Sequence, residues 1–325
     1  MKKILFFALA TLALVACSKP QGLTLTADGN PAAVGMVYLT QLGEAQPVDS
    51  AVIEDGAFKM QITGLNPAEV YQLSIPSLHM KEFLFAEEGQ LHLDMASDKL
   101  TGTPMAEEVS KIFLSLDNVQ TEEEYVAALR QAYDNHKTDL IGSIMLYYLA
   151  FELPVAEAFD MYENAAPVIR STAFMQQVAE VWEVEVSTSA GHPFVDFAVE
   201  YEGVTTRLSD FVGNGRKLTI VDFWASWCGP CKREIPFLIE VYNKYHAAGV
   251  EVVGVATWDE PQATLAAIDR LAIPYPQIIN AQRLGSDAYG IQGIPEIMMI
   301  GADGTILARG LRGAGIEEAV IENLK

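Results

Sequence analysis

A pair of cysteines separated by two residues constrains this sequence more than any other feature. Cys228 and Cys231 stand in the segment Trp-Cys-Gly-Pro-Cys-Lys, directly after an apolar run from Leu218 to Trp224. The apolar run predicts a buried strand, and the apolar spacing after Lys232 predicts a helix. A loop between them brings the two sulfurs within bonding distance, so we expect a Cys228–Cys231 disulfide that opens to a dithiol. Unpaired N–H groups at a helix start stabilise a thiolate, which favours Cys228 as a nucleophile near neutral pH.

The cysteine count supports a redox pair. The chain has three cysteines, and the third, Cys17, leaves no partner for a structural bridge. Half of a zinc site is the alternative, but zinc needs further ligands. The histidines show no ligand-like pairing; they are His79, His92, His136, His192 and His246. We therefore expect no metal and no cofactor.

The first residues predict export. Lys2 and Lys3 precede an unbroken run of apolar and small residues, Ile4 to Ala16, which is too short to span a bilayer. The run ends at Cys17 in a tetrapeptide that resembles the lipobox of bacterial lipoproteins. This resemblance implies a signal peptide over residues 1–16, lipid attachment at Cys17 and a tether over 17–21. An ordinary secretory signal with an incidental cysteine is the alternative.

The charge excludes one class of partner. The chain has 43 acidic and 21 basic residues, a formal net charge of −22. Such a surface repels nucleic acid and anionic lipid headgroups, so we expect no nucleic-acid binding, and membrane association through Cys17 alone.

The pattern along the rest of the chain predicts three parts. Residues 22–103 show short alternating runs typical of a small β-sandwich, with turns at Asp55-Gly56 and Glu87–Gly89 that predict two hairpins. Residues 104–188 follow a helical period and predict about four helices. Residues 189–325 alternate strand and helix, which predicts an α/β layer fold with a mixed sheet.

The third part resembles a known family. Val221 to Lys232 is similar, almost residue for residue, to the thioredoxin active-site segment, and Ile294-Pro295 resembles the cis-proline loop of that fold. The stretch Cys-Lys-Arg-Glu-Ile-Pro that ends at Pro236 resembles the TlpA/ResA-like reductases of the cell envelope. The resemblance covers about residues 191–325 and implies a thioredoxin fold, with a mixed central sheet flanked by helices. The sandwich and the helical segment resemble those that precede such domains in envelope lipoproteins of Gram-negative bacteria.

The resemblance also implies roles for four residues. Cys228 corresponds to the attacking cysteine, exposed at the helix start, and Cys231 to the resolving cysteine one turn inside. Asp222 corresponds to the buried carboxylate that accepts the proton of the second thiol, and its alternative is a solvated acid at a strand end. Glu234 resembles a glutamate that tunes the thiols; its alternative is an exposed first-turn acid favoured by the helix dipole.

Five further residues are expected to contact substrate. Trp227 is expected to pack beside the thiols, with Gly229 and Pro230 between them. A cis bond before Pro295 would leave the backbone of Ile294 free to pair with an extended peptide. Glu296 departs from the threonine common in thioredoxins, and its charge would disfavour acidic partners.

The function implied is a membrane-anchored thiol:disulfide oxidoreductase that faces the periplasm of a Gram-negative bacterium. The Gly-Pro dipeptide matches reducing thioredoxin, whose potential is about −270 mV. This implies that the protein reduces disulfides of envelope proteins, and apocytochrome c is one candidate substrate. It also implies an electron donor in the membrane that restores the dithiol. The alternative is a binding or adaptor lipoprotein whose N-terminal half recognises partners and whose thioredoxin domain is a redox sensor. A peroxidase is disfavoured because peroxidatic cysteines usually lie in a motif without Cys-x-x-Cys.

Overall fold

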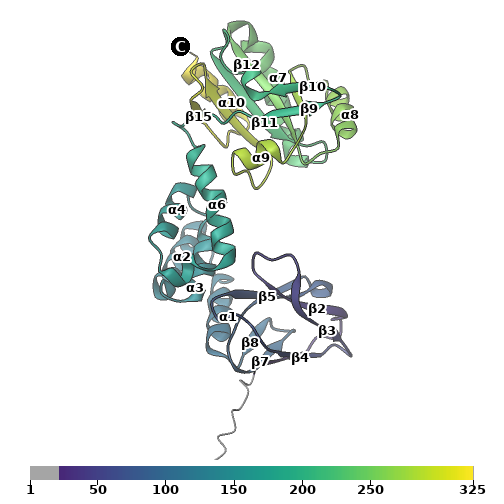
Figure 1. Cartoon of the computed structure of the whole chain (residues 1–325), viewed down its shortest axis with the longest axis vertical. Coiled ribbons are helices and arrows are strands. Elements are labelled where there is room, and N and C mark those ends of the chain that lie inside the picture. Colours follow the sequence, from purple (N-terminus) through teal and green to yellow (C-terminus); the bar gives the residue numbers. More distant parts are fainter. Residues whose placement is uncertain (1–21, 325) are drawn as a thin grey trace, which may run out of the picture. The chain divides into compact units, whose positions relative to one another are not determined.

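The computed structural model describes residues 22–324, which form two units (Figure 1). One unit runs to Leu149 and includes Ala165–Met175; the other comprises Ala150–Asn164 and the chain from Gln176 onward. The signal peptide predicted over residues 1–16, the tether over 17–21 and the lipidation of Cys17 lie outside the described residues.

The first unit contains a β-sandwich, as predicted. Its two sheets have the strand orders β4-β1-β7-β8 and β3-β2-β5-β6. Alternate residues of both sheets, among them Leu25, Leu39 and Leu73, are fully or almost fully buried in one shared core. The strands are β1 (Leu23–Asp28), β2 (Gly35–Gln41), β3 (Pro47–Ile53), β4 (Phe58–Ile62), β5 (Val70–Ile75), β6 (Met80–Phe85), β7 (Gly89–Asp94) and β8 (Lys99–Thr101).

Both hairpins predicted in this region are wrong. The turn at Asp55-Gly56 joins β3 to β4 and the turn at Glu87–Gly89 joins β6 to β7, but each turn connects strands of different sheets. Beside the first turn only an isolated bridge, Glu54 to Ala57, is formed. Local turn chemistry predicts a reversal of the chain, whereas the sheet that each strand joins is decided by packing of the whole sandwich. The antiparallel neighbours in sequence are β2–β3, β5–β6 and β7–β8.

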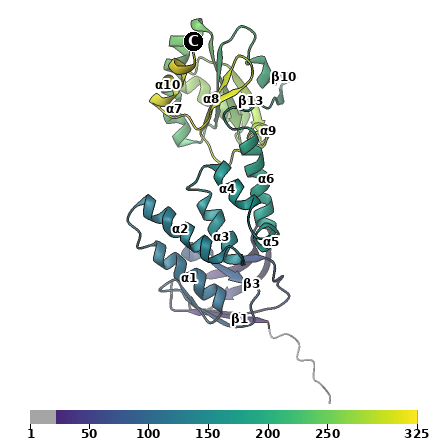
Figure 2. The same cartoon turned by 90° about the vertical axis from the view of Figure 1, so that its left-hand side faces the viewer.

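Helices follow the sandwich, as the period predicted, but residues 104–188 form six helices rather than about four. They are α1 (Pro104–Leu116), α2 (Glu122–His136), α3 (Leu140–Leu149), α4 (Val155–Glu163), α5 (Pro167–Arg170) and α6 (Ala173–Ser187). At the start of α2 the hydroxyl of Thr121 accepts the N–H of Glu124 at 3.2 Å. Phe83 of β6 stacks on Phe113 of α1, with ring centroids 5.7 Å apart, so α1 covers part of the sandwich (Figure 2).

The second unit has the predicted mixed sheet, in the order β13-β12-β11-β14-β15, beside a small β9–β10 pair. β11, β12 and β13 are parallel, and β14 and β15 are antiparallel to their neighbours. The strands are β9 (Ala198–Tyr201), β10 (Val204–Arg207), β11 (Leu218–Trp224), β12 (Val250–Thr257), β13 (Gln277–Gln282), β14 (Glu296–Gly301) and β15 (Ile306–Ala308). The helices are α7 (Gly229–Tyr245), α8 (Pro261–Leu271), α9 (Leu284–Ala288) and α10 (Ala314–Asn323).

The central strand β11 is buried along its whole length. Ile220 and Trp224 pack on one face of the sheet with apolar residues of α7, α8 and α10. Val221 and Phe223 pack on the other face, against Tyr289. Burial on both faces explains the near-continuous apolar run of β11. The end of this strand leads through the short loop 225–228 to the start of α7.

Candidate active site

The two cysteines lie at the junction of β11 and α7. Cys228 is the N-cap residue of α7, and its Sγ accepts the N–H of Cys231 at 3.1 Å. A disulfide joins the pair, whose Cα atoms are 5.4 Å apart. Pro230 occupies the first turn of the helix, where no N–H is needed. The helix start therefore directs an N–H group and its dipole at Sγ of Cys228, the arrangement that stabilises a thiolate after reduction.

The expectation that Cys228 is exposed is wrong in this disulfide form. The residue is 3% exposed and Cys231 is 0% exposed. Sγ of Cys228 lies 3.7 Å from the carbonyl oxygen of Ile294, so the cis-proline loop covers it while the disulfide holds it against α7. Gly229 and Pro230, at the rim, are exposed. A reacting sulfur must therefore approach between this rim and the cis-proline loop.

Trp227 lies on the rim rather than over the disulfide. Its side chain is 58% exposed, and its indole N–H donates to the carbonyl oxygen of Trp258 at 3.0 Å. Trp258 follows β12 and has a left-handed backbone, with φ at 55°. The hydrogen bond fixes one edge of the Trp227 ring and leaves its face open to a substrate.

The cis-proline loop lies beside the disulfide. The Ile294–Pro295 bond is cis, as expected, and both residues are half-buried. The guanidinium group of Arg312 donates to the carbonyl oxygen of Pro295 and, at 2.7 Å, to that of Leu311. Arg312 thereby joins the loop after β15 to the loop that faces Cys228.

Glu296 does not leave a free charge beside this loop, contrary to the expectation. Its carboxylate pairs with Nε of Arg309 at 3.0 Å, and both side chains are nearly buried, at 15% and 14% exposed. It also accepts the N–H of Gly310. Arg309, which directly follows β15, compensates the charge, and the local sequence does not identify it as the partner.

Asp222 is fully buried beneath the site, at 0% exposed, and not solvated at a strand end. Among the described residues, neither carboxylate oxygen has a hydrogen-bond partner. Burial raises the pKa of Asp222 to about 8, the positive charge of Arg312 opposes this shift, and the negative charge of Glu234 adds to it. The hydroxyl of Tyr275 is buried without a partner too, and burial together with Asp222 raises its pKa. A carboxyl group with a pKa near 8 can take up or release a proton near neutral pH.

Glu234 connects α7 to the loop before α10. Its Oε2 accepts the N–H of Gly313 at 2.7 Å, and the side chain is half-buried. It is therefore not a freely solvated first-turn acid. Its negative charge helps to raise the pKa of Asp222, since the two carboxyl groups repel each other.

Asp259 orders the loop before Cys228, and the sequence analysis did not identify it. The residue is 5% exposed, and its carboxylate accepts the N–H of Ser226 at 2.7 Å, the Ser226 hydroxyl at 2.9 Å and the Thr264 hydroxyl at 2.8 Å. β11 and β12 are parallel, so their carboxyl ends meet at one edge of the sheet. Asp259 and Ser226 each follow one of these strands, a signal that could have paired them.

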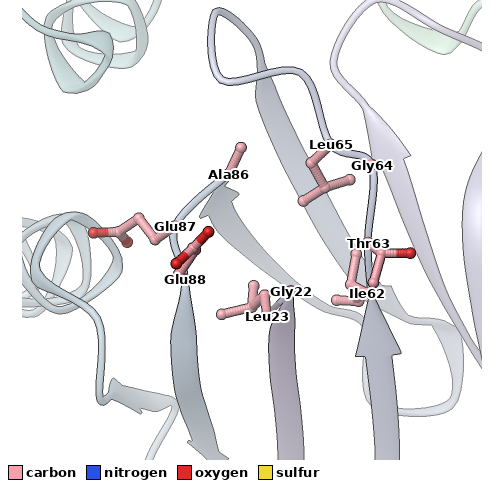
Figure 3. Close-up of a pocket in the computed structure, with 9 residues that line it drawn as sticks. All are labelled: Gly22, Leu23, Ile62, Thr63, Gly64, Leu65, Ala86, Glu87 and Glu88. Carbon is pink, nitrogen blue, oxygen red and sulfur yellow. The ribbon is translucent and has the colours of Figure 1, made fainter. Parts of the chain in front are cut away.

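Elsewhere in the described residues the structure shows no second redox site. A pocket of about 230 Å³ at one end of the sandwich is lined by Gly22, Ile62 and Glu87 among others (Figure 3). Glu87 there accepts the N–H groups of Met105 and Ala106 at the start of α1. Within residues 22–324 no group of three His, Cys, Asp or Glu side chains is placed to hold a metal ion. In the same range, no helix combines the length and apolar character needed to cross a membrane.

The fold and the site define a thioredoxin-like protein with a dithiol/disulfide pair. The family described as AhpC/TSA matches residues 190–309. A thiol-disulfide oxidoreductase ResA from Halalkalibacterium halodurans is 32% identical over 135 residues, 41% of this chain and 73% of that protein. ResA from Geobacillus thermodenitrificans is 29% identical over 129 residues, 39% of this chain and 72% of that protein. The crystal structure of the thioredoxin domain of a thiol-disulfide oxidoreductase from Bacteroides vulgatus is 26% identical, covers 42% of this chain and 99% of that one, and has a TM-score of 0.38.

The chain belongs to the ResA-like thiol-disulfide oxidoreductases. Its oxidoreductase domain lies in the second unit, where β11, α7 and the cis-proline loop meet.

Proposed function

We propose that this protein reduces disulfide bonds in proteins of the cell envelope, with Cys228 as the attacking and Cys231 as the resolving cysteine. The observation that supports this most directly is the cysteine pair at the start of α7 with the Ile294–Pro295 loop against Cys228. The relatives named above are thiol-disulfide oxidoreductases, which supports the same reaction class.

The reaction proceeds by two exchanges. The Cys228 thiolate attacks one sulfur of a substrate disulfide, a bond forms between these sulfurs, and the other substrate sulfur leaves as a thiolate. The Cys231 thiolate then attacks Sγ of Cys228 and releases the second substrate thiolate. Two electrons pass from the dithiol to the substrate, and the protein is left as the Cys228–Cys231 disulfide.

Asp222 accepts the proton that Cys231 must lose before the second exchange. Its burial below the pair and its raised pKa suit a base that is deprotonated in a fraction of molecules at neutral pH and in most above pH 8. Glu234 raises this pKa and thereby sets the pH range of the step.

Substrate binds along the rim of the site. Gly229 and Pro230 are exposed beside the disulfide, and the Trp227 ring is exposed next to them. An extended segment of the substrate would pair with the backbone at Ile294 and pass over Pro295. Such β-strand addition leaves the side chains of the segment free to contact the rim.

The location is part of the same proposal. Residues 1–16 act as a signal peptide, and lipid on Cys17 anchors the chain to a membrane with its domains in the periplasm. A reductase in an oxidising compartment needs a supply of electrons, so a dithiol donor in the membrane restores Cys228 and Cys231. The Gly229-Pro230 pair supports a reducing potential near the value of about −270 mV for thioredoxin.

The first test is turnover of a protein disulfide with a dithiol donor. The protein is expected to reduce the substrate, Cys228→Ser to abolish this, and Cys231→Ser to accumulate a mixed disulfide with substrate. Turnover that survives Cys228→Ser would refute the mechanism. Partners bound equally by Cys228→Ser and the native chain would support the adaptor alternative instead.

The second test addresses the anchor. Native chain expressed in a Gram-negative host is expected in the membrane fraction, and Cys17→Ser in the soluble periplasmic fraction, with equal turnover per molecule. Equal partition of the two chains would refute lipid attachment at Cys17 and leave the reaction mechanism untouched.

A further inference from the structure

Basic side chains surround the disulfide, although the chain as a whole is strongly acidic. The formal net charge is −22. Lys232 and Arg233 follow Cys231 on α7, and Arg312 lies in the loop that contacts the cis-proline loop. Among the described residues, none of these three forms an ion pair with a carboxylate, so their charges are available to a partner.

Arg312 is held close to the reacting sulfur. The carbonyl oxygen of Ile294 is 3.7 Å from Sγ of Cys228, and the carbonyl oxygen of the next residue, Pro295, accepts a hydrogen bond from Arg312. The guanidinium is thus fixed within one residue of the backbone edge that faces Cys228. Because Arg312 is also exposed, part of its donor fork remains free for a carboxylate.

The two residues on α7 extend the positive charge around the rim. Pro230, Arg233 and Phe237 are three and four residues apart, so they share one face of the helix, and all three are exposed. The ring of Phe237 lies next to Gly313, the neighbour of Arg312 in sequence. Lys232 lies on the other side, where its ammonium group donates to the carbonyl oxygen of Ser226 at 3.2 Å.

Four acidic side chains around these residues are buried or already engaged, whereas Glu260, next to Asp259 at the start of α8, is exposed. Glu296 pairs with Arg309, and Glu234 accepts the N–H of Gly313. Asp222 is fully buried, and Asp259 is buried and accepts hydrogen bonds from Ser226. The exposed charge beside the cis-proline loop is therefore positive, the opposite of what Glu296 alone predicts.

We propose that the redox site recognises an extended segment of its substrate protein in which acidic residues flank the disulfide cysteine. The segment pairs with the backbone at Ile294, and its carboxylates contact Arg312 on one side of Cys228 and Arg233 or Lys232 along α7. The rest of the molecule repels an acidic partner, so attraction is confined to this rim and orients the partner with its disulfide toward Cys228. This specificity rests on the proposed reductase function.

The test compares three peptides that share one disulfide and differ in flanking residues: Glu, Gln or Lys on both sides. kcat/KM is measured with an excess of dithiol donor, after subtraction of the donor's own rate, at low and at high ionic strength. We expect the Glu peptide to exceed the Lys peptide by about tenfold at low ionic strength, with the Gln peptide between them and a smaller ratio in high salt.

Substitutions of single basic residues identify which side chains cause the preference for the Glu peptide. Arg312→Gln is expected to reduce the ratio of kcat/KM for the Glu and Lys peptides about threefold, because one exposed ion pair changes kcat/KM only a few-fold. Arg312→Lys keeps the positive charge and is expected to retain most of the native ratio. Arg233→Gln tests the same surface without touching the cis-proline loop and is expected to lower the ratio by a similar factor. Arg270→Gln, an exposed arginine on α8, is the matched control and is expected to leave the ratio unchanged.

A ratio near one for the native chain, or a ratio that neither Arg312→Gln nor Arg233→Gln changes, overturns the recognition of acidic segments while turnover of the Gln peptide still supports the reductase. Absence of turnover for all three peptides overturns the reductase function and this specificity with it.

Discussion

At the scale of single residues, a buried carboxyl group without a hydrogen-bond partner dominates the chemistry beneath the cysteines. Asp222 lies on the central strand, opposite Ile297 of β14 and Gly254 of β12. A side chain at Gly254 would collide with the amide of Gln277, which in turn accepts the indole N–H of Trp224 at 2.9 Å. Polar groups therefore lie inside an otherwise apolar core, where a polar group without a hydrogen-bond partner lowers stability.

Asp222→Asn is expected to change how stability depends on pH. The pKa of Asp222 is about 8 in the folded protein and about 4 in the unfolded chain, so the folded state binds the extra proton between these values. The free energy of unfolding of the native chain should fall as pH rises from about 4 to about 8, and the variant should lack this fall. At pH 9 we expect the variant to be more stable by on the order of 5 kcal/mol, and at pH 4 the difference should largely vanish.

Denaturant unfolding of the oxidised protein, followed by tryptophan fluorescence, measures this difference. The chain has four tryptophans, and Trp182, Trp224, Trp227 and Trp258 all lie in the second unit, so the signal reports on the relevant unit. Asp269→Asn, at an exposed position of α8, is the control and should leave the pH dependence unchanged. A native chain whose stability is flat between pH 4 and pH 8 would contradict the burial argument.

Asp259→Ala is expected to impair both stability and turnover. The substitution leaves the N–H and hydroxyl of Ser226 without their acceptor and removes the shorter hydrogen bond of the Thr264 hydroxyl, which should lower the free energy of unfolding by about 2 to 3 kcal/mol. Turnover should also fall, because the released loop carries Trp227 and Cys228. Glu260→Ala, an exposed neighbour, provides the control; equal effects of both substitutions would show that Asp259 has no special role.

At the scale of elements, α7 owes its position to contacts at its first turns. Cys228 caps the helix, and Glu234 binds the backbone of Gly313 in the loop before α10. The same loop carries Arg312, which binds the cis-proline loop. Three segments distant in sequence are thereby held together around one sulfur, so a change at Glu234 should affect both geometry and electrostatics.

Two substitutions at Glu234 separate these effects. Glu234→Gln keeps an acceptor for Gly313 but removes the negative charge, so the pKa of Asp222 and the midpoint of the pH profile of mixed-disulfide resolution should move down. Glu234→Ala should shift the midpoint in the same direction and also lower stability by about 1 kcal/mol. Rapid-mixing measurements of resolution across pH give the midpoint, with Glu240→Gln as an exposed control on α7. An unmoved midpoint would exclude Glu234 from tuning the site.

Secondary structure was predicted more accurately than strand pairing. The alternation of strands and helices in residues 189–325 was predicted, because β11 is buried on both faces and α7 has one apolar face, but the edge strand β13 was not predicted. In the sandwich, Asp55-Gly56 and Glu87–Gly89 were correctly recognised as turns but wrongly assigned to hairpins. A turn signal describes a few residues, whereas the choice of sheet depends on which partner strand is available in space.

At the scale of the whole molecule, the end of α6 bears on the boundary proposed at residue 189. Thr188 is 1% exposed, and its hydroxyl accepts a hydrogen bond from the Arg309 guanidinium at 3.0 Å. Gly290 packs against the backbone of α6 so closely that a side chain there would collide with Val181 and Glu185. The last turns of α6 therefore contribute to the stability of the thioredoxin-like domain.

A shortened chain tests this contribution. A chain that starts at Gln176 is expected to exceed one that starts at Ser189 in free energy of unfolding by about 2 to 4 kcal/mol. The longer chain keeps the partners of Arg309 and buries Thr188, and each hydrogen bond contributes about 1 kcal/mol. Chemical denaturation of both chains gives the difference. Equal stabilities would support the predicted domain boundary at residue 189 and would show that α6 only connects the domain to the preceding helices.

The sequence by itself determined the reaction class. The Cys228–Cys231 spacing, the buried strand before it and the helix after it are local features, and strand-to-helix junctions with two thiols have one principal chemical use. Local features also specified Asp222 and Pro295 as candidates, since both lie in segments that resemble the thioredoxin pattern.

Only the tertiary structure decided what surrounds the reacting sulfur. Cys228 is buried by a loop 66 residues away in sequence, Glu296 is neutralised by Arg309, and Arg312 brings a positive charge to the cis-proline loop. Burial and electrostatic interactions depend on distances through space, and a one-dimensional pattern carries no such distance until the chain has folded.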